Sequence, residues 1–157
     1  MSDRKLSTRI DNSKSDFGNV CFGVPQGSVL GPLLFLIYVN DIEEIVENSF
    51  IFLFADDIIL ISIDPNYNKM IQNLQKDFDQ INLWFALNEV FISESKTQFI
   101  TIRSCHARIS EKKNIYLHDC TCSTLNCHKT CIKINEVEEA KYLGFIINGP
   151  AKCTLRT

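Results

Sequence analysis

Two short apolar runs separated by only two acidic residues constrain the fold of this chain more than any other feature. The runs span residues 50–55 and 58–63, are rich in aromatic and β-branched side chains, and are joined by Asp56-Asp57. This composition is typical of buried β-strands. Because so few residues connect the runs, the sequence predicts an antiparallel hairpin with a tight turn.

The Asp56-Asp57 turn also indicates chemistry. Two-residue hairpin turns usually contain Asn-Gly or Asp-Gly, whereas two adjacent carboxylates beside buried strands repel each other. Mg²⁺ would neutralise them, because it prefers oxygen ligands and is commonly held by one or two protein carboxylates together with substrate phosphates. The alternative is an exposed acidic turn without a ligand, and the dipeptide taken alone favours that alternative.

The elements around the hairpin indicate an α+β fold. Helical spacing from Pro32 onward predicts a helix of about four turns, with apolar positions Leu34, Ile37, Tyr38, Ile42, Ile45 and Val46. Asp64-Pro65 is expected to be the N-cap and first residue of a long amphipathic helix, whose apolar stripe is Met70, Ile71, Leu74, Phe78, Ile81, Trp84 and Phe85. Further strands are expected at 98–103, 132–134 and 142–147. This order predicts an antiparallel sheet with helices packed on one face.

Composition limits the classes of protein to consider. The chain has 157 residues, 45% of them hydrophobic, which suits one domain with a core. A net charge of −3 provides no basic stripe for a phosphate backbone, so a nucleic-acid partner can be argued only from motifs. No apolar run approaches the roughly 18 residues of a membrane span, and Met1–Lys5 opens no signal peptide. We therefore expect a soluble, intracellular protein of the nucleus or cytoplasm, with reduced cysteines, no secretion and no membrane partner.

A Cys/His-rich stretch at 105–131 is expected to be a long loop or insertion. It contains Cys105, His106, His118, Cys120, Cys122, Cys127, His128 and Cys131. Structural zinc ligands are commonly separated by two to four residues, and only Cys127 with Cys131 has such a spacing. We expect no zinc site here.

The residues around the hairpin resemble the reverse transcriptases of non-LTR, LINE-type (jockey-like) retrotransposons. The ten residues of the loop that precedes the first helix match the family's loop: Gly23-Val24-Pro25-Gln26-Gly27-Ser28-Val29-Leu30-Gly31-Pro32. Phe54-Ala55-Asp56-Asp57 is similar to the family's signature hairpin. Later blocks follow in family order, namely Trp84 to Asn88, Ser95-Lys96-Thr97 and Lys141-Tyr142-Leu143-Gly144. The resemblance covers nearly the whole chain.

The resemblance implies RNA-directed DNA polymerase activity, a partial polymerase palm, and three kinds of partner: an RNA template, a DNA primer and deoxynucleoside triphosphates. Asp56 and Asp57 would bind Mg²⁺ or Mn²⁺ for two-metal nucleotidyl transfer, with Asp56 ranked first. Lys96 would act as a catalytic cation near the β- and γ-phosphates. Template and nucleotide would contact Gly23, Pro25, Gln26, Gly27 and Ser28.

The primer's end would lie against Tyr142, Leu143 and Gly144. Alternatives remain for each motif: a helix-entry loop whose glycines serve geometry alone, a solvated Lys96, and an ordinary core strand at Tyr142. One departure concerns Glu94, where relatives usually have proline, and it leaves that loop less rigid.

The resemblance also defines three regions. Residues 1–19 would be a polar lead from the finger-to-palm connection, residues 20–149 a partial palm, and residues 150–157 a tail. The family's palm begins with a strand that bears the first metal-binding aspartate, whereas Asp3, Asp11 and Asp16 lie in the polar lead without an apolar strand. We therefore expect the isolated chain to be inactive. The alternative function is a degenerate or domesticated fragment that binds nucleic acid or protein without catalysis.

Overall fold

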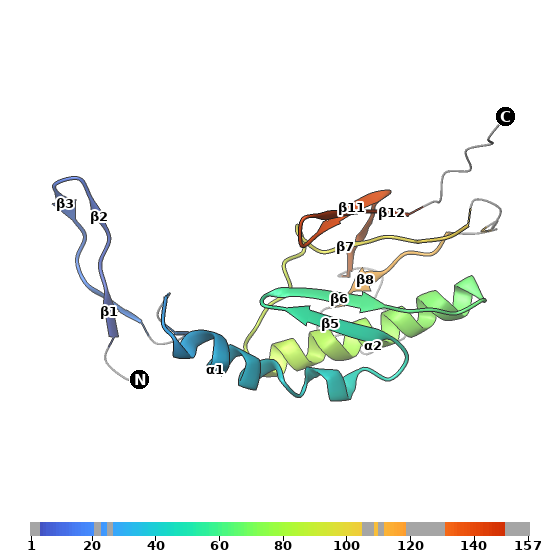
Figure 1. Ribbon diagram of the computed structural model, residues 1–157, viewed down its shortest axis with the longest axis horizontal. Helices are drawn as coiled ribbons and strands as arrows, with labels where there is room; N and C mark the ends of the chain where they lie inside the picture. The colour runs from blue at the N-terminus through green and yellow to red at the C-terminus, as the bar shows by residue number, and fades with distance from the viewer. Residues whose placement is uncertain are drawn as a thin grey trace. The chain divides into compact units, whose positions relative to one another are not determined.

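The computed structural model describes residues 4–20, 23–24, 27–104, 109, 112–118 and 131–149 (Figure 1). The chain forms two compact units, Met1–Asn40 and Asp41–Thr157. Each unit is described here by itself.

The first unit begins with a long β-hairpin. Strand β1 (Arg4–Leu6) pairs antiparallel with β4 (Gly18–Val20), and β2 (Arg9–Ile10) pairs antiparallel with β3 (Ser13–Lys14). The Thr8 amide donates to the Ser15 hydroxyl and the Ser15 amide to the Thr8 carbonyl, each over 2.9 Å, so the two ladders form one ribbon. The region expected to be a polar lead without an apolar strand thus contains short, mostly polar strands, which can pair because Asp11, with φ at 51°, and Asn12 form a tight turn.

Helix α1 (Leu30–Val39) follows the glycine-containing loop. It contains Pro32 in its first turn, as expected, but it ends at Val39 rather than continuing for about four turns. Asn40 and Asp41 interrupt it, since short polar side chains compete for backbone hydrogen bonds. The predicted remainder is a separate 3₁₀ helix, η1 (Ile42–Ile45), which belongs to the second unit.

The second unit is built around a hairpin and a long helix. Strand β5 (Phe50–Phe54) pairs antiparallel with β6 (Asp57–Ile61), as the apolar runs predict, but β5 is mostly exposed rather than buried. The hairpin is followed by α2 (Tyr67–Leu87), which contacts β6 and η1 (Figure 1). The cap of α2 lies later than expected. Asn66 is the N-cap, and its side-chain oxygen accepts hydrogen bonds from the amides of Asn68 and Lys69.

The rest of the second unit consists of short strands. Strand β7 (Gln98–Phe99) pairs parallel with β10 (Asn135–Glu136), and β8 (Tyr116–Leu117) pairs antiparallel with β9 (Ile132–Lys133). Strands β11 (Glu139–Tyr142) and β12 (Phe145–Asn148) form a second antiparallel hairpin. The single strand predicted at 142–147 is thus wrong, because a turn at Leu143-Gly144 divides it. The whole is a mixed α/β arrangement.

The core of the second unit lies between α2 and these strands. Its buried members are Ile71, Phe99, Ile115, Leu117 and Ile134, with Tyr67, Met70, Leu74, Phe78 and Ile92 packed against them. The predicted apolar stripe of α2 is therefore confirmed by its packing, and Ile81 and Trp84 are also buried. Burial of this stripe stabilises the long helix more than its intrinsic propensity does.

Polar side chains of α2 fix segment 112–118 beside this core. Gln75 acts like a strand residue, because its side-chain carbonyl accepts from the Tyr116 amide (2.8 Å) and its NH₂ donates to the Tyr116 carbonyl (2.7 Å). One turn further on, Asp79 contacts Nδ1 of His118 at 2.8 Å, and Asn82 donates to the His118 carbonyl over 2.7 Å. His118 is the one histidine of the Cys/His-rich stretch within the described residues, and its ring nitrogen faces a carboxylate. No helix among the described residues is long and apolar enough to cross a membrane.

Candidate active site

The Asp56-Asp57 pair lies at the tip of the β5–β6 hairpin. Phe54 and Asp57 are the last paired residues, so the turn consists of Ala55 and Asp56, and Asp57 is the first residue of β6 rather than part of the turn. Ala55 has φ at 52°, in the left-handed region that non-glycine residues rarely adopt. Backbone strain of this kind is common at functional sites, where it fixes neighbouring groups in place. Both aspartates are exposed.

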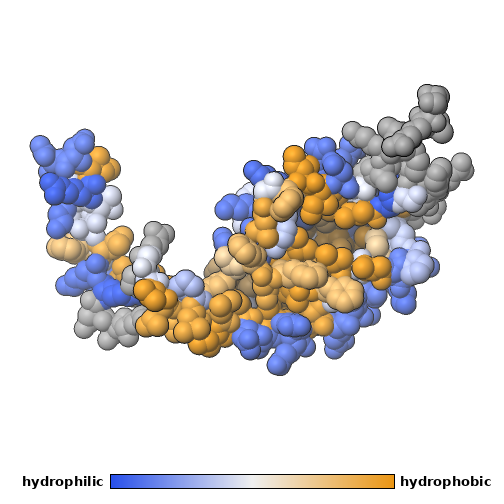
Figure 2. All heavy atoms as spheres, viewed as in Figure 1, coloured by the Kyte–Doolittle hydropathy of each residue, from blue (hydrophilic) through white to orange (hydrophobic). Residues whose placement is uncertain are grey.

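Asp57 lies on the open face of this hairpin. Cross-strand partners share a face, so Asp57 lies beside Phe54 and on the same side as Phe52 and Phe50. These phenylalanines are 59%, 53% and 60% exposed. Figure 2 shows apolar side chains gathered over this part of the second unit. The arrangement places a carboxylate at the end of an uncovered aromatic stripe, accessible to a large ligand.

The glycine-containing loop before α1 is described at Gly23, Val24, Gly27 and Ser28, whereas Pro25 and Gln26 lie outside the described residues. Gly23 and Gly27 both have φ at 76°, and a Cβ added at either would meet nothing within 4 Å. The glycines are thus required by backbone conformation, with open space in front of them. Arg4 donates a hydrogen bond from its guanidinium to the Gly23 carbonyl. The geometry of the loop is compatible with contact to template and nucleotide, and equally with a loop that only leads into α1.

Lys96 lies in a tight turn, exposed to solvent. The Ser93 carbonyl accepts from the Lys96 amide (3.2 Å), the Thr97 amide (2.9 Å) and the Thr97 hydroxyl (2.8 Å). These three hydrogen bonds order a loop that we expected to be less rigid because Glu94 replaces proline. Glu94 itself is exposed, so its charge is solvated.

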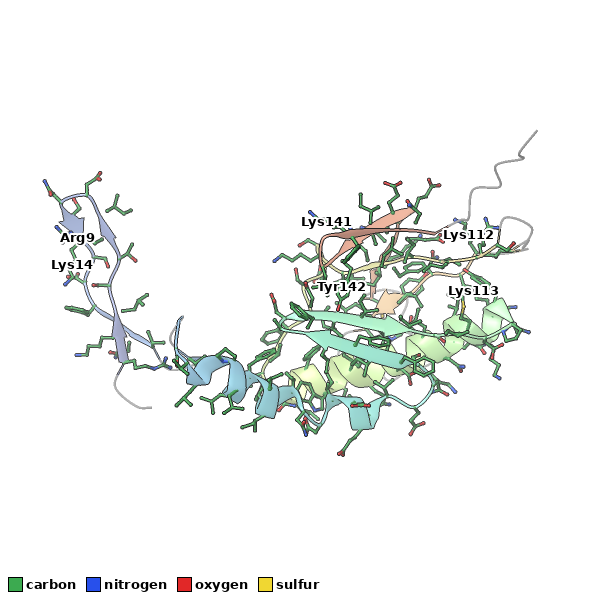
Figure 3. The ribbon with its side chains drawn as sticks, viewed as in Figure 1. Arg9, Lys14, Lys112, Lys113, Lys141 and Tyr142 are labelled. Atoms are coloured by element: carbon green, nitrogen blue, oxygen red, sulfur yellow. The ribbon has the colours of Figure 1, made fainter. Side chains whose placement is uncertain are left out.

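Tyr142, Leu143 and Gly144 form the tip of the β11–β12 hairpin. Tyr142 pairs with Phe145, and the two turn residues have φ at 47° and 86°. Positive φ at both central positions is the signature of a type I′ turn, for which leucine is an unusual residue. Lys141 and Tyr142 project from opposite faces of β11, since neighbouring strand residues alternate (Figure 3). The site is therefore a hairpin tip and not a continuous core strand, whereas the contact with a primer stays a prediction.

The described residues offer two metal donors at the candidate site. Asp56 and Asp57 provide hard, exposed carboxylate oxygens, which suit Mg²⁺ or Mn²⁺. Within the described ranges no three His, Cys, Asp or Glu side chains converge on one point. The expectation about zinc falls mostly outside these ranges, because among the eight cysteines and histidines of that stretch only His118 and Cys131 are described.

A hollow elsewhere in the second unit contains none of the predicted site residues. Its lining combines two glutamates with two basic side chains, and its members are Thr101, Arg103, Lys112, Glu136, Val137 and Glu138. Lys112 is paired with Glu136 at 2.9 Å. Its basic and acidic side chains neutralise one another, so we regard this hollow as a surface groove and not as a second candidate site.

Sequence reasoning missed one cationic cluster, in the N-terminal hairpin. Arg9 and Lys14 are direct cross-strand partners, and the Lys14 ammonium lies 4.5 Å from the centre of the Phe17 ring. The dipeptide Asp11-Asn12 between two short polar runs could have indicated the turn that brings them together.

An exposed pair of aspartates on a strained hairpin tip provides oxygen donors that are compatible with metal-dependent phosphoryl transfer. Comparison with known families identifies the family of the chain. Residues 3–147 match the reverse transcriptase (RNA-dependent DNA polymerase) family. The chain belongs to this family, and a domain of this family implies a palm-type fold.

Curated relatives come from Drosophila mobile elements. The chain is 28% identical over 152 residues to an RNA-directed DNA polymerase from mobile element jockey of Drosophila funebris, covering 92% of this chain and 15% of the relative. It is 39% identical over 98 residues to a probable RNA-directed DNA polymerase from transposon X-element of Drosophila melanogaster, covering 60% and 11%. A probable polymerase from transposon BS of the same fly is 31% identical over 91 residues, covering 54% and 10%.

These relatives confirm the resemblance to jockey-like enzymes of the non-LTR type. The chain spans about 15% or less of the length of these curated relatives. No solved structure is significantly similar to it.

Proposed function

We propose that this chain is part of the palm of an RNA-directed DNA polymerase of a non-LTR retrotransposon, which extends a DNA primer on an RNA template with deoxynucleoside triphosphates. The observation that carries the proposal is the exposed Asp56-Asp57 pair at a strained hairpin tip, in a chain of the reverse transcriptase family. We further propose that the antiparallel strand pairs of the second unit belong to a palm sheet covered by helices on one face, and that the protein acts inside the cell.

Each side chain of the proposed site has a role that its chemistry supports. Asp56 and Asp57 would hold Mg²⁺ or Mn²⁺ through their carboxylate oxygens. When bound, the ions neutralise charge on the attacking 3′-hydroxyl and on the leaving pyrophosphate. Ala55 fixes the direction of Asp56, because a left-handed residue leaves the turn few alternative conformations.

The remaining residues would position the substrates. Lys96 would place its ammonium beside the β- and γ-phosphates and donate a proton to the departing pyrophosphate. The open space in front of Gly23 and Gly27 would admit the templating base pair close to the backbone. The exposed tip formed by Leu143 and Gly144 would contact the end of the primer.

The 157 residues by themselves are expected to lack polymerase activity. Nucleotidyl transfer by two ions needs carboxylates from separate strands, and the described residues bring no third acidic, His or Cys side chain to Asp56 and Asp57. A missing ligand weakens the clamp on both reacting oxygens, so the deficit should be several orders of magnitude in rate.

Primer extension on an RNA template tests the proposal. The chain alone should show no extension with Mg²⁺ or Mn²⁺, and fusion to the N-terminal palm segment of a family member should restore some. In the fusion, Asp56→Asn should abolish extension, because asparagine keeps the shape and removes the charge. Glu44→Gln, an equally conservative change in η1, should leave it unchanged.

Extension by the 157 residues alone would contradict the requirement for a further aspartate. Activity of the fusion with Asp56→Asn would contradict the metal-binding role. A fusion that folds but never extends a primer would favour the second candidate function, a fragment that binds nucleic acid or protein without catalysis. The observation in favour of this second candidate is that no third acidic, His or Cys side chain joins Asp56 and Asp57 among the described residues.

A further inference from the structure

The N-terminal hairpin is a basic segment of an acidic chain. Residues 4–20 carry four basic and two acidic side chains, whereas the chain as a whole has 16 basic and 19 acidic residues. The hairpin is thus positive although the net charge is −3. Figure 2 shows hydrophilic side chains along most of it. A local excess of this kind creates a positive potential that the overall composition hides.

The strand pairing concentrates this charge on one face. Arg9 and Lys14 are direct cross-strand partners and both are exposed (Figure 3). Alternation along the strand places exposed Lys5 on the same face as Arg9. Like charges directly opposite each other destabilise a hairpin. In the described part of the chain neither Arg9 nor Lys14 forms an ion pair that would offset this repulsion.

A bulge brings an aromatic ring to the same cluster. Leu6 pairs with Gly18 in one ladder and Arg9 pairs with Lys14 in the other. Between these pairs, residues 15–17 on one strand lie opposite residues 7–8 on the other, so the first segment has one extra residue and forms a bulge. This bulge places Phe17, which is 63% exposed, under the Lys14 ammonium at 4.5 Å. The cation–π contact orders Lys14, and the ring remains accessible to a further ligand.

We propose that this cluster, formed by Lys5, Arg9, Lys14 and Phe17, binds single-stranded nucleic acid. The cations would contact successive phosphates and the phenylalanine would stack on a base, a combination that binds single strands with little sequence preference. The inference rests on the proposed function only in taking nucleic acid as the ligand. It concerns binding and requires no catalysis.

Fluorescence anisotropy with the full chain and a labelled single-stranded 20-nucleotide RNA tests the proposal. The double substitution Arg9→Gln with Lys14→Gln should weaken binding roughly 10- to 30-fold at 0.1 M salt. It should also reduce the slope of log K against log salt by about 1.4, since each phosphate contact contributes about 0.7 for single strands. Melting temperature should not fall, because the like-charge repulsion is removed.

Matched variants distinguish the effect of this cluster on RNA binding from the effect of the net charge of the chain. Lys76→Gln with Lys133→Gln removes two exposed lysines from the second unit and should leave affinity and slope unchanged. Arg9→Lys with Lys14→Arg keeps the charge and should retain the slope. Phe17→Ala should weaken binding to the single strand more than to a duplex of the same sequence, because a paired base cannot stack on the ring.

The proposal would be overturned if the wild-type chain failed to bind RNA, or if the control pair weakened binding as much as the hairpin pair. Binding to anionic lipid vesicles that depends on Arg9 and Lys14, with no binding to RNA, would also overturn it in favour of a membrane surface. The same assay with a single-stranded DNA of the same sequence identifies whether the cluster prefers RNA or DNA. Asp56→Asn should leave RNA binding intact, so a failure of catalysis is distinguishable from a failure of this site.

Discussion

Asp77 on α2 accepts two hydrogen bonds from Asn48, one from its backbone amide and one from its side-chain amide, both over 3.0 Å. The Glu47 amide donates to the same carboxylate over 3.3 Å. Asp77 is only 1% exposed, and it was not among the residues that the helical pattern predicts to be buried. Because the backbone amides of residues 47 and 48 lie just before β5, this carboxylate fixes the start of the hairpin relative to the helix.

Replacing Asp77 with alanine should lower the free energy of unfolding by about 1–3 kcal/mol, because three donors on exposed residues would lose their buried acceptor. Gln80→Ala, an exposed change on the same helix, should remain within about 0.5 kcal/mol of wild type. Urea unfolding followed by circular dichroism measures both. Equal stability of the two variants would show that the Asp77 contacts contribute nothing net.

Gly149→Ala should destabilise the second unit by about 1–3 kcal/mol through overpacking. A Cβ at this buried glycine would lie 2.9 Å from the Thr101 carbonyl oxygen, a backbone atom that cannot swing away. The glycine is held in place as well, since its amide donates to the Glu138 carbonyl over 2.9 Å. Gly18→Ala is the control, because its Cβ would meet the nearest atom only at 3.9 Å. Thermal melting should separate the two variants, and an unchanged melting temperature for Gly149→Ala would contradict the steric argument.

Ala55→Gly should raise the free energy of unfolding by up to about 1 kcal/mol, since glycine adopts a left-handed backbone without a Cβ clash. The same change in the middle of a helix, Ala86→Gly in α2, should instead lower it by about 0.5–1 kcal/mol. Opposite signs in one urea-unfolding experiment would support strain at the hairpin tip. Destabilisation by both changes would mean that Ala55 is not strained in solution.

Acid should weaken the start of α2 through Asp64. The Asn66 amide donates to this carboxylate over 2.8 Å and Lys69 forms an ion pair with it at 3.1 Å, and these contacts hold the pKa of Asp64 below its usual 3.8. A lowered folded-state pKa means that the carboxylate stabilises the folded chain above about pH 3.8 and that this contribution is lost as the pH falls through the lowered pKa. Asp64→Asn should therefore be less stable than wild type at pH 6, with a smaller difference at pH 2. A difference that does not depend on pH would contradict the assignment.

The sequence predicted the elements whose pattern is periodic and long. The pairing of β5 with β6 was predicted from two β-branched and aromatic runs joined by a short turn, and the buried stripe of α2 was predicted from its helical period. The burial expected for the strands was wrong for β5, because its phenylalanines are exposed. The ends of elements were predicted less well. Asn66 rather than Asp64 caps α2, and α1 ends before Asn40, because several neighbouring polar residues compete for each boundary and tertiary contacts decide among them.

At the candidate site, too, some features could be predicted from the sequence and others could not. The position of Asp56 at a hairpin tip follows from its motif, whereas the turn at Leu143-Gly144 falls inside a predicted strand. The left-handed backbone of Ala55 and Leu143 has no sequence signature, because these residue types usually avoid it. The Arg9–Lys14 pair was missed because strands of two residues have too short a pattern to detect. The Gln75–Tyr116 contact joins residues 41 positions apart, which local sequence does not report.

The aromatic stripe on β5 affects how the protein behaves at high concentration. Phe50–Phe54 contains neither charge nor proline, and within the described residues β5 pairs only with β6, which leaves one edge of each strand free. An uncharged, aromatic edge strand is a template for adding strands from other molecules, in the manner of cross-β fibrils. Concentrated preparations should therefore form thioflavin-positive fibrils seeded at this segment, and a single lysine in place of Phe52 should delay them by breaking the uncharged run.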